Sequence, residues 1–166
     1  MRFKANEDYF MGIDPGKSGG IVVLDGNGKV LFSAKMPDTE HDVYYTITGE
    51  LNKLWGNVRA LIEKVGGYTG GKGAPGSAMF NFGASVQSAR TSLIASGVTW
   101  EDATPQKWQK AFNLGKSEKG PKGKTKWKNK LKAKAQQLFP KEKVTLKTAD
   151  AYLIAEFCRR YHKGML

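Results

Sequence analysis

Residues 11–24 constrain the fold more than any other part of the chain. Their sequence is Met-Gly-Ile-Asp-Pro-Gly-Lys-Ser-Gly-Gly-Ile-Val-Val-Leu, so a short apolar run ends at Asp14, turns through Pro15-Gly16 and resumes after Gly20. Apolar runs separated by glycine and proline are typical of two strands joined by a tight turn. The pattern predicts a carboxylate held at the end of a strand. Asp14 is then either an ordinary turn residue or a ligand for a divalent cation on a rigid element.

The charge of the chain indicates its class of partner. The 166 residues carry a formal net charge of +12, and nine lysines but a single acid lie between Lys116 and Lys134. Lysines bind phosphates with release of counterions, so this segment favours a nucleic acid. A solvated face that keeps the protein soluble is the other interpretation. No long apolar span accompanies the lysines, so we expect no membrane partner.

Length and cysteine content restrict the organisation of the protein. With 40% hydrophobic residues, a chain of this length suits a single domain over residues 1–166. The only cysteine is Cys158, which excludes a disulfide framework and a thiolate zinc cluster. Residues 1–10 are mixed polar and charged, so we expect no secretory signal. Together these features predict a reduced, cytoplasmic environment.

Hydrophobic periodicity predicts five strands and five helices. Strands are expected at residues 8–14, 20–24, 30–34, 58–65 and 98–103. Helices are expected at residues 42–56, 83–96, 105–112, 125–139 and 149–161, with a glycine-rich loop at 66–77 and a flexible basic loop before residue 125. This order makes the first and fourth strands neighbours in a mixed sheet. We therefore predict an α/β fold with helices flanking the sheet.

Three acids fall at the ends of these predicted elements. Asp14 ends the first strand, Glu63 lies near the end of the fourth, and Asp150 lies in the first turn of the last helix. The first two carboxylates would project from one edge of the sheet, with the last helix packed across it. Three carboxylates without clustered cysteine or histidine favour Mg²⁺ or Mn²⁺. Two such ions about 4 Å apart can activate a water and stabilise the leaving oxygen of a phosphodiester.

Four motifs follow one another in the chain. They are Gly-Ile-Asp-Pro-Gly at 12–16, Leu-Ile-Glu-Lys-Val at 61–65, Thr-Pro-Gln-Lys-Trp-Gln-Lys at 104–110, and Thr-Ala-Asp-Ala-Tyr-Leu-Ile-Ala-Glu at 148–156. On these motifs the chain resembles the RuvC-type Holliday junction resolvases of the RNase H-like superfamily, and is most similar to their phage-encoded branch. The resemblance implies an RNase H-like mixed five-stranded sheet flanked by helices. It also implies a homodimeric endonuclease that cuts four-way DNA junctions, in the host cytoplasm if the chain is phage-encoded.

The resemblance assigns roles to individual residues. Carried over by position, it implies that Asp14, Glu63 and Asp150 are the metal ligands. Lys147 stands where many family members have a further acid, three residues before the last one. This lysine either offsets charge on the scissile phosphate as a catalytic residue, or is a solvated residue before a helix.

The candidate residues for DNA contact lie in three parts of the chain. The candidates for phosphate contact are Lys107 in the third motif and Lys116, Lys119, Lys122, Lys124, Lys126, Lys128 and Lys130 in the basic segment. In the resembled family an aromatic residue near the glycine-rich loop reaches into the junction. Tyr68, Phe80 and Phe82 are the candidates here, and the two phenylalanines have the alternative of packing in the core.

Other functions remain consistent with the same residues. If Lys147 blocks metal binding, the chain is a non-catalytic module that binds branched DNA. A different RNase H-like nuclease would act on flaps, forks or RNA–DNA hybrids. A sugar-kinase-like phosphotransferase also has a turn of this type, but the chain is too short for the two-domain cleft of that class.

Overall fold

Five strands form a single mixed sheet in the computed structural model, which describes residues 7–64 and 76–166. The strands are β1 Glu7–Asp14, β2 Gly20–Asp25, β3 Val30–Lys35, β4 Gly56–Glu63 and β5 Trp100–Ala103. Their order across the sheet is β3-β2-β1-β4-β5. β1 is antiparallel to β2 and parallel to β4. The predicted pairing of the first and fourth strands is confirmed.

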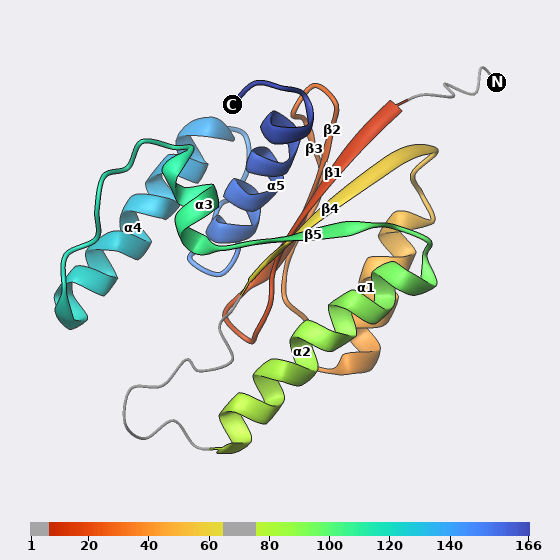
Figure 1. Ribbon diagram of the computed structural model, residues 1–166, viewed down its shortest axis with the longest axis horizontal. Coiled ribbons are helices and arrows are strands. Elements are labelled where there is room, and N and C mark those ends of the chain that lie inside the picture. The colour runs from red at the N-terminus through yellow and green to blue at the C-terminus, as the bar shows by residue number, and fades with distance from the viewer. Residues whose placement is uncertain (1–6, 65–75) are drawn as a thin grey trace.

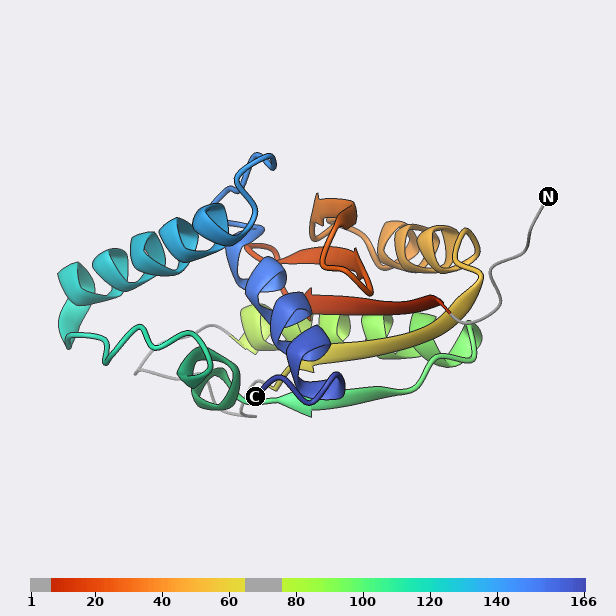
Figure 2. The ribbon, with the colours of Figure 1, turned by 90° about the horizontal axis from the view of Figure 1, so that it is seen from above.

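Helices cover both faces of this sheet (Figures 1 and 2). They are α1 Glu40–Leu51, α2 Gly76–Ala95, α3 Pro105–Lys110, α4 Gly120–Leu138 and α5 Ala149–His162. α1 and α2 pack on one face, while α5 crosses the other with α3 and α4 beside it. Much of α4 projects beyond the edge of the sheet. The α/β fold class with flanking helices agrees with the prediction.

The central strands are apolar on both sides because each side faces a helical layer. On β1, Met11 and Ile13 pack with α1 and α2, whereas Phe10 packs with α5. On β4, Ile62 and Leu61 divide in the same way. Strands buried on both faces have nearly continuous apolar runs, and such runs marked these strands in the sequence.

α5 crosses β1 at a glycine. A Cβ atom on Gly12 would lie 2.2 Å from the backbone nitrogen of Ala155 and 2.5 Å from the backbone oxygen of Ala151. No side chain fits between the two backbones, so only glycine permits this approach. At the same helix, the Tyr152 hydroxyl donates to Ser33 Oγ on β3 at 2.8 Å. α5 is therefore fixed closely against the middle of the sheet.

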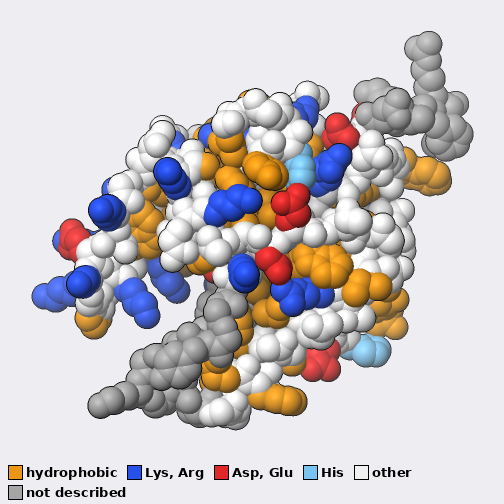
Figure 3. Space-filling view, viewed as in Figure 1, with side chains coloured by type: hydrophobic (Ala, Val, Ile, Leu, Met, Phe, Trp, Pro, Cys, Tyr) orange, Lys and Arg blue, Asp and Glu red, His pale blue; other side chains and the backbone are white. Residues whose placement is uncertain are grey.

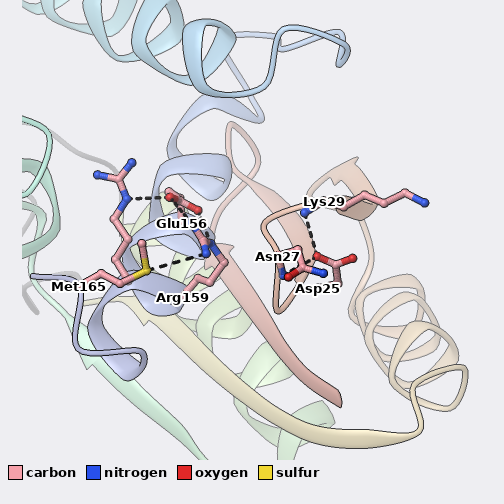
Figure 4. A network of polar contacts seen from close by, with 7 residues as sticks. Asp25, Asn27, Lys29, Glu156, Arg159 and Met165 are labelled. Carbon is pink, nitrogen blue, oxygen red and sulfur yellow. Dashed lines mark hydrogen bonds and ion pairs between the residues drawn. The ribbon is translucent and has the colours of Figure 1, made fainter. Parts of the chain in front are cut away.

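An ion-pair network holds the C-terminal end of α5 (Figure 4). The buried carboxylate of Glu156 accepts from Arg159 Nε at 2.8 Å and from Arg160 Nε at 2.6 Å. Burial raises the pKa of Glu156, but the two arginines outweigh this effect and lower the pKa overall. In the β2–β3 turn, Asp25 Oδ1 accepts the backbone N–H groups of Asn27 and Lys29. Glu156 is thus paired with two positive charges, and Asp25 is paired with two backbone N–H donors.

α1 and α2, which pack on one face of the sheet, have boundaries that differ from the predicted ones. α1 ends at Leu51 rather than at residue 56, and Trp55 beyond it is 70% exposed. α2 begins at Gly76 rather than at residue 83, so both phenylalanine candidates lie on a helix. Ile94, near the end of α2, is 61% exposed. The predicted loop at 66–77 lies mostly outside the described residues.

The basic segment forms a longer helix than predicted. α4 begins at Gly120, so Lys122 and Lys124 lie on the helix and not in a flexible loop. Gly120 adopts a φ of 87°, and Pro121 occupies the first turn, where proline is tolerated. None of the helices in the described residues is both long and apolar enough to cross a membrane. Cys158 is free and buried in α5.

We predict that Gly12→Ala lowers the free energy of unfolding by at least about 2 kcal/mol, because the added methyl group overlaps the α5 backbone. The matched control is Gly83→Ala on α2, where a Cβ atom meets nothing within 4 Å. Alanine is the better helix former, so this control should gain about 0.5–1 kcal/mol. Urea denaturation measures both changes. A Gly12→Ala protein as stable as wild type would contradict the close crossing.

Candidate active site

Two of the three acids lie at the same edge of the sheet. The parallel register pairs Ile13 of β1 with Ile62 of β4, and Asp14 and Glu63 follow directly on the two strands. Ile13 and Ile62 pack against α1 and α2. Side chains alternate along a strand, so the next residues face the α5 side of the sheet. The strand geometry therefore brings the two carboxylates to one face and one edge.

Asp150 reaches this edge from the first turn of α5. Thr148 occupies the N-cap position, but its side chain makes no capping bond to the helix. Instead Thr148 Oγ1 accepts the backbone N–H of Thr145 at 3.1 Å, and Thr145 Oγ1 accepts that of Thr148 at 3.2 Å. Gly20 allows this turn to approach β2, since a Cβ there would lie 3.2 Å from Thr148 Cα. The start of α5 is thus held next to the β1–β2 turn.

The three carboxylates interact through their charges. Burial, followed by repulsion from Glu63 and Asp150, raises the pKa of Asp14 well above its usual range. Burial also raises the pKa of Glu63 to about 7, with Asp150 adding to the shift. Burial raises the pKa of Asp150 to about 6. Burial and repulsion among the acids thus outweigh the groups that favour their charged forms.

Trp108 of α3 contacts the site directly. Its indole N–H donates to Glu63 Oε2 at 2.9 Å, and its side chain is fully buried. This hydrogen bond lowers the pKa of Glu63 and partly opposes the effect of burial. α3 is held in place by Thr104, whose Oγ1 accepts the backbone N–H of Lys107. This hydrogen bond joins residues 45 positions apart in the chain, and the sequence signal for it is the place of Trp108 in the third motif.

The donor set suits a hard divalent cation. All three acids supply carboxylate oxygens, and their uncompensated charge is what such an ion would neutralise. Across residues 7–64 and 76–166, no three His, Cys, Asp or Glu side chains have the geometry to hold a metal ion as they stand. The chemistry of the donors therefore fits a metal, and their side chains must adjust to bind it.

One lysine of α4 acts on the acids through its charge. The charge of Lys128 lowers the pKa of both Asp14 and Asp150. Lys147 lies in the turn before α5, where its side chain is exposed and its backbone oxygen packs near Gly20. Its catalytic role stays a prediction. The sequence did not distinguish Lys128 from the other lysines of its segment.

The remaining candidates occupy several surfaces. Lys116 and Lys119 are exposed in the connector between α3 and α4, residues 111–119. Lys107 places its ammonium group 4.7 Å from the ring centre of Tyr161. Lys122, Lys124, Lys126 and Lys130 lie on α4 together with Lys128.

The aromatic candidates differ in exposure. Phe80 on α2 is 77% exposed. Phe82 is half-buried, and its ring approaches the Asp14 turn so closely that a Cβ on Gly16 would lie 3.0 Å away. Phe82 also lines a cleft of about 520 Å³ between this turn, α1 and α2. Tyr68 lies outside the described residues.

Comparison with known proteins identifies the fold. No protein-family model matches the chain, and no curated sequence matches it. Among solved structures, Thermus thermophilus RuvC in complex with Holliday junction substrate is 13% identical, with 96% of each chain covered and a TM-score of 0.64. Another Thermus thermophilus RuvC structure is also 13% identical, with 94% of this chain and 96% of that one covered and a TM-score of 0.62. The chain therefore has a RuvC-like fold of the RNase H-like type.

We predict that Glu63→Gln stabilises the metal-free protein at pH 8 by about 1–2 kcal/mol and has little effect at pH 4. The folded protein holds a proton on Glu63 up to a pKa of about 7, compared with 4.5 for the unfolded chain. The wild-type free energy of unfolding therefore falls as the pH rises through this window. Glutamine removes that fall and still accepts from Trp108.

Urea denaturation in the presence of a chelator measures this difference. Glu118→Gln is the control, because its carboxylate is exposed and pairs with the exposed Lys126. If wild type and Glu63→Gln show the same pH dependence, Glu63 carries no uncompensated charge.

Proposed function

We propose that the protein is a metal-dependent, structure-selective endonuclease that cleaves four-way DNA junctions by hydrolysis of a phosphodiester, as a single nuclease domain. The observation that carries this proposal is the meeting of Asp14, Glu63 and Asp150 at one edge of the sheet, beside a lysine-rich helix. Carboxylates and lysines have complementary roles in hydrolysis of a phosphodiester. The acids attract cations, and the lysines attract the phosphates that those cations act on.

Asp14, Glu63 and Asp150 would hold the ions, Mg²⁺ or Mn²⁺, with two ions in each active site. When bound, such ions supply positive charge for the attacking and leaving oxygens of a phosphodiester. Trp108 positions Glu63 through its indole N–H. The raised pKa values of Glu63 and Asp150 mean that cation binding must displace protons below about pH 7. Cation affinity, and with it cleavage, should rise with pH in this range.

Branched DNA is the proposed substrate. Support comes from Thermus thermophilus RuvC, which shares this fold over 96% of each chain and whose structure contains Holliday junction substrate. The projecting α4 adds a long basic surface next to the acids. Phosphate contacts position DNA without reading its sequence, which suits a substrate recognised by its branching.

The homodimer and the cytoplasmic location stay predictions. α2 would give a second copy an approachable surface, since Arg90 is its only charged residue over Gly76–Ala95. Ile94 on this helix is largely exposed. The chain carries a net charge of +12, so two copies repel each other. Contact through the surface of α2 would reduce this repulsion, because that helix has a single charged residue.

We predict that Asp14→Asn, Glu63→Gln and Asp150→Asn each abolish junction cleavage while junction binding survives. Each amide keeps the shape of the side chain and removes the charge that a cation requires. Single-turnover cleavage of a synthetic junction in Mn²⁺ measures the first effect, and binding in a chelator measures the second. A panel of flaps, forks and RNA–DNA hybrids at matched salt identifies a different nuclease. Near-normal turnover in one variant would remove that residue from the metal site.

We predict that Lys147→Ala slows cleavage by about 10²- to 10³-fold with little loss of affinity, if its ammonium group stabilises charge on the scissile phosphate. Lys147→Asp separates the alternative that the position lacks a further ligand, because an acid would then raise activity or relax the metal requirement. Single-turnover rates and junction affinities of both variants give the answer. Full activity of Lys147→Ala would make this lysine a solvated residue.

A further inference from the structure

The alternating lysines of α4 divide into two rows. Between residues 122 and 134 a lysine stands at every second position. A helix turns by about 100° per residue, so neighbours in this series point about 200° apart, and lysines four residues apart share a side. One row therefore holds Lys124, Lys128 and Lys132, and the other holds Lys122, Lys126, Lys130 and Lys134. The buried Leu131 and Ala135 face the rest of the protein between them.

Two lysines of the second row contact the connector, residues 111–119. Lys126 Nζ pairs with Glu118 at 3.0 Å, and Lys130 Nζ donates to the backbone oxygen of Leu114. Gly123 permits the close approach, because a Cβ there would lie 2.3 Å from the backbone oxygen of Glu118. These lysines are therefore engaged with their own chain.

The first row lies across the buried face of α4 from the connector, because the two rows flank Leu131 and Ala135. Lys128 in this row is close enough to Asp14 and Asp150 for its charge to act on both. Lys124 and Lys132 lie one turn before and one turn after it, about 6 Å away along the helix axis. Figure 3 shows lysine and arginine side chains along both edges of the projecting helix. The row leads from the free end of α4 toward the acids.

We propose that Lys124, Lys128 and Lys132 form a phosphate track, which binds the backbone of the DNA strand that enters the carboxylate site. On the other side of α4, Lys126 and Lys130 instead hold the connector, and the row that they share with Lys122 contributes little to DNA binding. This inference rests on the proposed function, since it names the part of α4 that guides the substrate. It also changes an expectation from the sequence, which treated the lysines of this segment as equivalent.

The test compares two triple variants of the whole protein. The track variant is Lys124→Gln, Lys128→Gln and Lys132→Gln, and the connector variant is Lys122→Gln, Lys126→Gln and Lys130→Gln. Both remove three charges from one helix, and glutamine has nearly the helix propensity of lysine. They differ only in the side of α4 that is neutralised. A third variant with arginine at the three track positions keeps the charge.

The readout is the affinity for a synthetic four-way junction in a chelator, as a function of salt. Each lost phosphate contact should lower the log–log slope by about 0.9. We expect the slope to fall by about 2–3 for the track variant and by less than 1 for the connector variant, with the arginine variant close to wild type. Limited proteolysis should cut the connector variant faster within residues 111–119.

Two results would overturn the phosphate track: equal slopes for the two glutamine variants, or a larger fall for the connector variant. If a glutamine triple does not fold, the single variants Lys128→Gln and Lys126→Gln give the same comparison, with an expected fall of about 0.9 for the first alone. Failure of the proposed nuclease function would give a different result from failure of the phosphate track. It would appear as absence of cleavage by wild type in Mn²⁺, whatever the slopes in the chelator.

Discussion

The close crossing of α5 over β1 at Gly12 is the contact on which the site depends. A Cβ at this position would lie 2.2 Å from the α5 backbone, so any other residue would push the helix away from the sheet. With the helix at this distance, its first turn brings Asp150 to the edge where β1 and β4 end. The parallel pairing of these strands places Asp14 and Glu63 there already. One backbone-to-backbone contact thus brings carboxylates from three elements together.

The resulting cluster is electrostatically unfavourable in the free protein. Burial and mutual repulsion raise the pKa of Asp14, and burial raises that of Glu63 and Asp150. Two groups partly offset this cost: the Trp108 indole on Glu63, and the charge of Lys128 near Asp14 and Asp150. Perturbed carboxylates beside a basic surface are typical of functional sites, since folding alone gains nothing from them. A cation bound among the acids would relieve the repulsion.

Much of this arrangement could be predicted from local patterns. The apolar runs in the sequence predicted where β1 and β4 lie in the chain. The order of the elements predicted that these two strands pair. The errors arose where the pattern was weak or the partner distant. α2 and α4 begin earlier than expected because glycine-rich and lysine-rich stretches have no apolar periodicity to mark a helix. The Trp108 hydrogen bond to Glu63 and the two rows of lysines on α4 depend on tertiary contacts between residues far apart in the chain.

Cleavage of a synthetic four-way junction by the wild-type protein, titrated with Mg²⁺ and Mn²⁺, tests the central claim most directly. We expect no cutting in a chelator, and cutting that rises with the concentration of either cation. The nicks should fall near the branch point. Junction binding without cutting at any concentration of either ion would contradict a catalytic site at Asp14, Glu63 and Asp150.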